Sequence, residues 1–600
     1  MEQKLYSHHV FIFPFKWELT KYRQDESLLK RCRIEEIRGL LDATDWKRKE
    51  FSIQGGEQYN EFNYFFGHVR EILYDLSAEL RDESCEGNKE LINHFEFDKS
   101  KIADWYYVIG NVTEWEENKN KTDELPNKKV PKNVETFFLT LDSILLNIYS
   151  TGVAVLSFHL RNFKYADPDE ILRINQLGRR LYPPHFGLSN TSVITGIQDK
   201  TSFQDGLDDT KSNELPHFIS LGTYDGFRTS GFYEDFQSYT DAKNIERGVF
   251  QIPAFINALF PVGFLGVGRK SAKTNQRANR LAFEVSVDPI LDSRMHLVCW
   301  YANSKVFKRL RDYFNIGLNA WSNKAHDWWY KYVFVDNAGF ITCWNLEMKN
   351  SLVQQATYKR WLELGTLFGV SRYSFVMFTE DRVPLYLVRH LQTMYYKMAE
   401  LCLVQRATVI NYADEVTHVS HLLLDSSQGD LTLEKIATLY KKYLVFINKI
   451  YFNEVTPQEQ GIELYDMMHR QMRIREDVMA LDKQIEELHN YSAFEKNEKG
   501  NSLLATISII GAVFLPLGFV ASLMEWHVLE DDFLRGGAFS GPFWSRIGVV
   551  IFISVLMVLV MDVLTKFKYK SKHRRYHTAI RVVFYFTFMA LGIYLIWSFI

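Results

Sequence analysis

The chain has 600 residues, a formal net charge of −3, and 70 lysines and arginines against 73 aspartates and glutamates. This balance excludes a strongly basic protein, so no direct binding of nucleic acid is expected, although a local basic site remains compatible with it. The five cysteines are scattered and form no CxxC pair or other metal-ligand spacing, which indicates reduced, mostly buried thiols rather than a disulfide framework.

The first part of the chain predicts α/β structure. Residues 136–148 and 153–161 alternate in hydrophobicity and predict a β-hairpin. Asp167, followed by proline and by a glutamate three positions on, predicts the start of a helix. A second unit is expected further along, with strands at 331–335, 340–344 and 373–378 and a helix over 347–368. The pattern between 383 and 450 is long and helical.

Two groups of basic residues are candidates for ligand binding. The first group follows the helix of the first unit. The alternative to ligand binding there is that the basic residues simply provide favourable charges at the C-terminus of the helix. The second is the stretch GFLGVGRKS, which misses the phosphate-loop pattern by one inserted residue and has arginine in the place of the lysine. A glycine-rich basic turn can still bind an anion without hydrolysing it, and a solvated basic face is the alternative. The candidate ligand-binding residues are Arg179, Arg180, Tyr182, Arg269, Lys270 and Lys273.

No Ser/His/Asp or paired-carboxylate arrangement stands out in the sequence, so we expect neither an enzyme nor a required cofactor. A helix is expected to start at Thr456 and Pro457, ahead of a long apolar seam. The seam residues recur at steps of three and four: Leu464, Met467, Gln471, Ile474, Val478, Leu481, Ile485 and Leu488.

Such a seam favours association between helices, and the alternative is an amphipathic helix packed on its own domain. A helix that continued unbroken through Met524 would have roughly 68 residues and a length of about 100 Å. Gly500 is the one residue placed to interrupt it.

Three apolar segments follow, at 501–524, 547–565 and 582–600, and each is long enough to cross a hydrocarbon core of ~30 Å. The link between the second and third segments is basic, and the link between the first and second is acidic. The positive-inside rule therefore predicts a multi-pass protein of the cell inner membrane with a cytoplasmic N-terminal domain. The predicted fold class is an α/β cytosolic domain with a long helical stalk, followed by an α-helical transmembrane domain with three spans. The predicted regions are an N-terminal cytosolic region (1–135), the α/β cytosolic part (136–380), a helical cytosolic segment (381–455), the stalk helix (456–500) and the transmembrane domain (501–600).

One face of the first apolar segment is mostly small or polar, which suits the wall of a water-filled pore. Close packing of helices in lipid would use the same residue types and is the alternative. The candidate pore-lining residues are Asn501, Leu504, Ser508, Gly511, Leu515, Gly518, Ser522 and Glu525.

The run FLPLGFVASL, Phe514 to Leu523, resembles the end of the first transmembrane helix in the CorA magnesium-transporter superfamily, and the second apolar segment with its basic tail resembles the next helix. The resemblance covers about a fifth of the chain. It implies a homopentamer in which five copies of the first helix surround a pore. The family's Gly-Met-Asn motif is missing, because Glu525, Trp526 and His527 stand in its place. A ring of Glu525 would still attract cations and is the candidate metal-binding position. The residues that resemble the family's outer acidic loop are Glu530, Asp531 and Asp532.

The resemblance leaves three functions open. The first is a CorA-like oligomeric channel or cation transporter gated by a nucleotide second messenger, as in the CorA-like effectors of type III CRISPR antiviral defence. The second is a constitutive divalent-cation transporter of altered selectivity, for which Mg²⁺ is a candidate transported ion. The third is a non-conducting, membrane-anchored scaffold. The expected partners are thus the membrane, further copies of the chain and a nucleotide activator.

Overall fold

The structure is a computed structural model that describes a large part of the chain. The chain forms two units, Met1–Glu486 and Glu487–Ile600. The described residues are 4–21, 37–39, 41, 44–77, 80, 91–102, 105–117, 129–181, 216–222, 232–236, 252–260, 264–266, 283–292, 294–317, 323–336, 338, 341–384, 386–424 and 429–523.

Strands of the described residues join in one 14-stranded mixed sheet, whose main path runs β12-β13-β14-β11-β1-β6-β5-β4-β7-β8. In this part of the chain the pairs β11–β14 and β9–β10 are parallel and the other ladders are antiparallel. The strands are β1 (Ser7–Lys21), β2 (Trp46–Arg48), β3 (Ile92–Phe97), β4 (Tyr106–Glu117), β5 (Lys129–Tyr149), β6 (Val153–Asn162), β7 (Phe218–Leu221), β8 (Tyr233–Asp235), β9 (Phe264–Gly266), β10 (Phe283–Pro289), β11 (His296–Ala302), β12 (Thr357–Tyr358), β13 (Thr366–Val370) and β14 (Ser374–Thr379).

The N-terminal strand β1 lies in the middle of this sheet. One of its edges pairs with β6, from Ser7 opposite Asn162 to Lys16 opposite Val153. Its other edge pairs first with β11 and then with β10. Pro14 lies between these two ladders, at a point where this edge of β1 pairs with neither β11 nor β10. The backbone N–H that proline lacks is therefore not needed for a ladder hydrogen bond on this edge. The apolar run VFIFPF therefore forms a central strand in spite of its proline.

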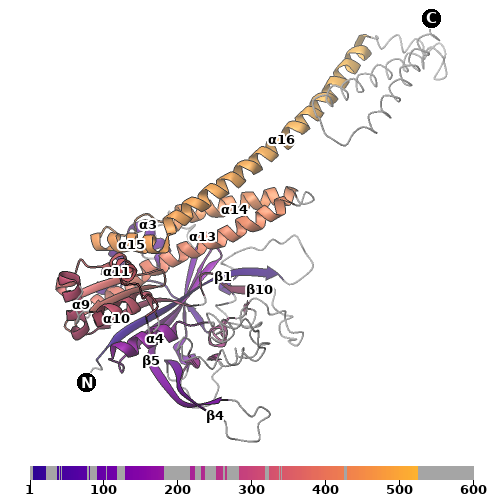
Figure 1. Cartoon of the computed structure of the whole chain (residues 1–600). Coiled ribbons are helices and arrows are strands. Elements are labelled where there is room, and N and C mark those ends of the chain that lie inside the picture. The colour runs from indigo at the N-terminus through magenta and orange to yellow at the C-terminus, as the bar shows by residue number, and fades with distance from the viewer. Residues whose placement is uncertain are drawn as a thin grey trace, which may run out of the picture. The chain divides into compact units, whose positions relative to one another are not determined.

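Helices cover both faces of the sheet (Figure 1). The helices are α2 (Gly56–Tyr64), α3 (Gly67–Leu73), α4 (Pro168–Gly178), α8 (Ala254–Asn257), α9 (Ser304–Ile316), α10 (Asn323–Phe334), α11 (Leu346–Ala356), α12 (Tyr386–His390), α13 (Tyr396–Leu423), α14 (Gly429–Lys449), α15 (Glu459–Met472) and α16 (Ile474–Leu523), with the short 3₁₀ helices η2 (Lys99–Lys101) and η5 (Leu362–Leu364) and the π-helix η6 (Leu391–Tyr395).

The alternation of side chains along β1 separates the two helical layers. His9 Nδ1 lies 2.7 Å from Asn175 Oδ1 of α4, whereas His8 Nδ1 lies 3.3 Å from Gln392 Nε2 of η6. The layer with α4 encloses the aromatic core, which includes Phe11 of β1. The opposite layer contains α13, which contacts β1 and β6 and is in turn covered by α14 and α15.

The predicted hairpin and the helix after it are confirmed as β5, β6 and α4. Asp167 caps α4 in a capping box with Glu170, as the sequence predicted. The second predicted unit is wrong in part, because 323–334 form the helix α10 where a strand was expected, and the predicted long helix ends at Ala356. Its last predicted strand is confirmed as β14.

The predicted stalk helix over 456–500 is not a single helix, because Arg473 separates α15 from α16 in a left-handed conformation with φ 56° and ψ 32°. Gly500 does not interrupt a helix, since it lies inside α16, which has 50 residues. The seam is buried within this chain: Leu464 and Ile474 are 0% exposed and Ile485 is 1% exposed. The packing of the seam on its own domain, the alternative reading of the sequence, is therefore what the structure contains.

The predicted fold class, with its three-span transmembrane domain, is also wrong. Over the part of the chain that the structure describes, none of the helices has the combined length and apolar character needed to cross a bilayer. The half of α16 before Gly500 is highly charged. The second and third predicted spans lie outside the described residues.

Candidate functional site: a buried basic cluster

The structure describes only part of each group of predicted site residues. Arg179 and Arg180 follow α4, whereas Tyr182, Arg269, Lys270 and Lys273 lie outside the described residues. Of the predicted pore-lining residues, Asn501, Leu504 and Ser508 are exposed on α16 and Gly511 is half-buried. Leu515, Gly518 and Ser522 belong to the same helix, but their side chains are outside the description, as are Glu525, Glu530, Asp531 and Asp532.

Arg179 lies at the end of α4, where the helix comes very close to the sheet. A β-carbon on Gly178 would lie 2.6 Å from Phe11 Cζ, so only glycine permits this approach. The backbone then joins the start of β11, because Met295 N–H donates to the Arg179 carbonyl over 2.8 Å. Arg180 forms an isolated antiparallel bridge with Arg294. The end of α4 is thus fixed against the loop before β11.

The Arg179 side chain is 1% exposed, although it is always charged at physiological pH. Its Nη2 donates to the carbonyl of Val335 over 2.9 Å, and its guanidinium lies 6.0 Å from the ring centre of Tyr373. Nε and Nη1 have no hydrogen-bond partner among the described residues. Val335 has a φ of 50°, which is rare for a β-branched residue and turns this part of the backbone away from regular structure.

Arg294 packs on the same tyrosine. Its guanidinium lies 4.6 Å from the ring centre of Tyr373 and donates to both carboxylate oxygens of Asp292, over 3.1 and 2.8 Å. The carboxylate of Asp292 thus neutralises the charge of Arg294. No ion pair joins Arg179 to a carboxylate within the described ranges.

Arg406 comes from α13 and reaches the cluster from the other helical layer. It is 7% exposed, and its Nη1 lies 3.5 Å from the carbonyl of Arg372 in the β13–β14 turn. Its Nε has no partner among the residues described. Burial, followed by the charge of Arg372, lowers the pKa of Arg406 to about 10, while Asp477 of α16 favours the charged form.

His296, the first residue of β11, is close to both buried arginines. It is 5% exposed, and its Nε2 has no partner in the described part of the chain. Burial, followed by the charges of Arg406 and Arg179, lowers its pKa to about 3, so the imidazole is neutral at physiological pH. We call this group the basic cluster; it consists of Arg179, Arg180, Arg294, His296, Arg372, Tyr373 and Arg406.

The electrostatics of the basic cluster indicate an anion site. Removing a guanidinium from water costs several kcal/mol, even after relaxation, unless a counter-charge is close. Burial, together with Arg294 and Arg180, lowers the pKa of Arg179 well below its usual value, while the charge of Asp292 acts in the opposite direction. A bound oxyanion would satisfy the unpartnered N–H groups and supply the missing charge.

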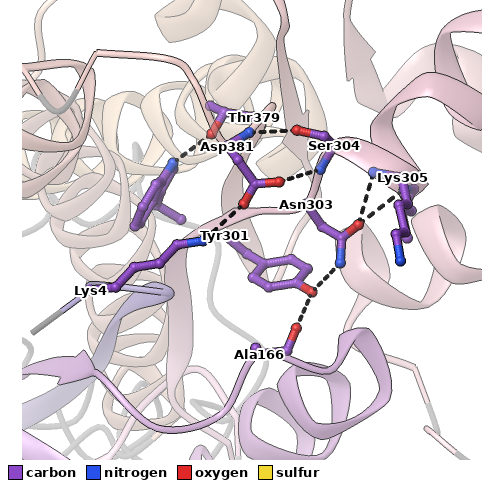
Figure 2. A network of polar contacts seen from close by, with 10 residues as sticks. Lys4, Ala166, Tyr301, Asn303, Ser304, Lys305, Thr379 and Asp381 are labelled. Atoms are coloured by element: carbon purple, nitrogen blue, oxygen red, sulfur yellow. Dashed lines mark hydrogen bonds and ion pairs between the residues drawn. The ribbon is translucent and has the colours of Figure 1, made fainter.

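A second polar network lies where the parallel strands β11 and β14 end (Figure 2). Ser304 N–H donates to Asp381 Oδ2 and Asp381 N–H donates to Ser304 Oγ, both over 2.9 Å. Lys4 Nζ lies 3.5 Å from Asp381 Oδ1, and Asn303 accepts from the next two N–H groups of α9. Since Asp381 and Asn303 already occupy the start of α9, this network is a structural joint rather than a ligand site.

A buried thiol, imidazole and amide also meet near the core. Cys299 Sγ lies 3.4 Å from His9 Nδ1, and the same nitrogen lies 2.7 Å from Asn175 Oδ1. Both the thiol and the amide thus compete for one ring nitrogen. Cys299 is 0% exposed and burial raises its pKa to about 12, so it lacks the accessible thiolate that a nucleophile requires. Within the described ranges, the side chains form no group of three or more His, Cys, Asp or Glu suited to a metal ion.

Comparison with known proteins adds no family to this description. No model of a known protein family matches the chain, and no curated protein is significantly similar to it. The resemblance to the CorA superfamily therefore stays a prediction from the sequence. The functional assignment depends on the geometry of the basic cluster.

Sequence reasoning found two members of the basic cluster and missed the others. Arg179 and Arg180 were visible as adjacent charges after a helix. Arg406 has a weak signal, because it interrupts the apolar run LCLVQRATV in the middle of α13. His296 and Tyr373 have no local signal, since only the pairing of β11 with β14 brings them together.

Proposed function

We propose that this protein binds a small phosphate-bearing ligand of the nucleotide class at the basic cluster, and that binding regulates helices α15 and α16. The observation that carries the proposal is Arg179, a fully buried guanidinium with two unpartnered nitrogens and no carboxylate ion pair among the described residues. Phosphate oxygens are the natural partners for several convergent guanidinium groups.

Helix α13 supports the regulatory part of the proposal. It carries Arg406 at the cluster and, one residue earlier, Gln405, whose amide donates to Tyr465 of α15 over 3.0 Å. Asp477 in the first turn of α16 favours the charged form of Arg406. A bound anion would compete with Asp477 for Arg406, so occupancy of the cluster would change the balance of charges at the start of α16.

The variant Arg179→Met tests the proposal through two independent measurements. It keeps a chain of similar volume but removes a buried charge, so without ligand the variant should be more stable than the unmodified protein, by about 1–4 kcal/mol. In calorimetric titrations with ATP, AMP and inorganic phosphate, the same variant should lose at least about tenfold in affinity.

Arg311 provides the matched control, because it is ion-paired with Glu380 over 3.1 Å outside the cluster. Arg311→Met should leave ligand affinity unchanged. The proposal is refuted if the unmodified protein binds none of these anions, or if Arg179→Met binds them as tightly as before.

The wider interpretations of the sequence stay predictions. Gated conduction, constitutive cation transport, a passive scaffold and a role in antiviral defence depend on the first apolar segment, whose side chains are described only in part, and on residues after Leu523, which lie outside the described part of the chain. Homo-oligomer formation likewise stays a prediction, and the 464–488 seam that suggested it is largely buried within the chain.

A further inference from the structure

Val335, directly after helix α10, has a backbone conformation that valine rarely adopts. Its φ of 50° is left-handed, and Arg473 is the one other non-glycine residue with a positive φ among the described residues. The amide of Asp336 donates to the carbonyl of Lys331 over 3.1 Å, which is the closing bond of a Schellman motif. Glycine usually occupies the left-handed position of this motif. A residue with a β-carbon is disfavoured there by a factor of roughly 5 to 30.

The end of α4 holds this turn at two points. Arg179 Nη2 donates to the Val335 carbonyl over 2.9 Å. Three residues earlier in the chain, Gln176 Oε1 accepts from the Ala338 N–H over 2.9 Å. A strained backbone persists only where the surrounding structure holds it in place. Of these two hydrogen bonds, the one from Arg179 acts on the strained residue itself.

An anion bound to Arg179 would compete with the Val335 carbonyl. Arg179 Nε and Nη1 have no partner among the described residues, and they lie on different edges of the guanidinium plane. Each therefore forms a two-donor edge only together with Nη2, the nitrogen that donates to Val335. Nη2 has a second N–H, but an anion beside it would repel the carbonyl oxygen. Hydrogen bonds to an ionised acceptor are also about twice as strong as those to a neutral one, so the anion should displace the carbonyl.

We propose that an anion bound at Arg179 releases the Val335 carbonyl, so that the end of α10 leaves its left-handed turn. This inference rests on the proposed function and adds a response at α10 to the one at α15 and α16. The strain at Val335 is present in the free protein and absent from the bound one. It therefore favours the bound state and raises the affinity for the anion.

The variants Val335→Gly and Val335→Ala test the proposal as a pair. Both lose the two methyl groups of valine, but only alanine keeps the β-carbon that makes the left-handed turn unfavourable. In calorimetric titrations of the full chain with ATP, AMP and inorganic phosphate, the glycine variant should bind at least about fivefold more weakly than the alanine variant. Equal affinities, or tighter binding by the glycine variant, would overturn the inference while leaving anion binding intact. If the unmodified protein binds none of the three anions, the proposed function and the inference fall together.

Gly317→Ala is the matched control for this pair. Gly317 follows α9, has a φ of 96° and lies outside the basic cluster. A β-carbon there would have open space around it, so the substitution adds backbone strain without a clash. Gly317→Ala should therefore bind the anions as tightly as the unmodified protein. A loss of affinity in this variant would mean that strain at any helix end alters binding, which contradicts a specific role of Val335.

Hydrogen exchange in the unmodified protein tests the release without a substitution at Val335. The bond from the Asp336 amide to the Lys331 carbonyl requires the left-handed residue between them, so it should break when the turn relaxes. Saturation with the tightest-binding of the three anions should speed exchange of the Asp336 amide by at least about fivefold. The amide of Gly317, which donates to the Tyr313 carbonyl over 2.9 Å, is the control and should exchange at an unchanged rate. An unchanged or slower rate at Asp336 would contradict the release.

Discussion

Substitutions of Arg473 distinguish a stalk that is broken at this residue from a continuous helix. The two alternatives predict opposite orders of stability for Arg473→Gly and Arg473→Ala. Arg473 has left-handed backbone angles, φ 56° and ψ 32°. A residue with a β-carbon in this conformation is about 1–2 kcal/mol less favourable than in a right-handed helix, whereas glycine adopts it freely. We therefore expect Arg473→Gly to be more stable than Arg473→Ala by about 1 kcal/mol. In an unbroken helix, glycine would be the less stable of the two by about 1 kcal/mol.

Hydrogen exchange at the junction measures this difference locally. The amide of Arg473 donates to the Arg470 carbonyl over 3.2 Å, and the amide of Asp477 donates to the Arg473 carbonyl over 3.1 Å. A difference of 1 kcal/mol changes the opening equilibrium by about fivefold, so these amides should exchange about fivefold more slowly in the glycine variant than in the alanine variant.

Lys483 is the control position, since it is exposed in the regular part of α16. There, Lys483→Ala should be more protected than Lys483→Gly. If alanine gives the better protection at both positions, the left-handed junction is wrong.

Three further predictions concern the sheet and its core. Gly178→Ala should destabilise the protein by about 1–3 kcal/mol, measured by urea unfolding, because the new methyl group would lie 2.6 Å from Phe11 Cζ; an unchanged midpoint would contradict this packing. Burial lowers the pKa of His8 to about 3 and of His9 to about 4, so the unfolded chain binds more protons below its own histidine pKa of about 6.5. The contribution of these histidines to the free energy of unfolding should therefore be fully present above about pH 6.5 and be lost as the pH drops towards 4. A urea midpoint that stays constant over this range would refute the assignment of His8 and His9 as buried and neutral. Cys299, with its raised pKa, should resist iodoacetamide in the folded protein and react after denaturation, as followed by mass spectrometry; rapid labelling in the folded state would contradict its burial.

Local signals in the sequence were sufficient for the hairpin and α4. The cap at Asp167 and the alternation of β5 and β6 depend on neighbouring residues, so they can be recognised without a partner. The position of β1 could not be found in this way, because its partners β6, β11 and β10 come from distant parts of the chain. The same long-range pairing brings His296 and Arg406 to Arg179.

Periodicity identified the apolar face of the stalk but not the surface that covers it. Leu464 and Ile474 show the same spacing whether the covering surface belongs to the same chain or to another copy. The break at Arg473 had no signal either, since arginine favours a regular helix and the nearest glycine that drew attention is Gly500. Tertiary packing decided both outcomes.

The central place of β1 has a consequence for biosynthesis. β1 leaves the ribosome long before its partners. β6, which pairs with one edge of β1, follows after about half of the chain that separates β1 from β11. The other edge must wait for β10 and β11, and His9 and its neighbour Cys299 are 290 residues apart. At about 5–20 residues per second, this wait lasts roughly 15–60 s. During that time the nascent chain presents an apolar strand with one open edge, a surface that recruits other strands. Efficient production of this protein should therefore depend on chaperones that act during translation.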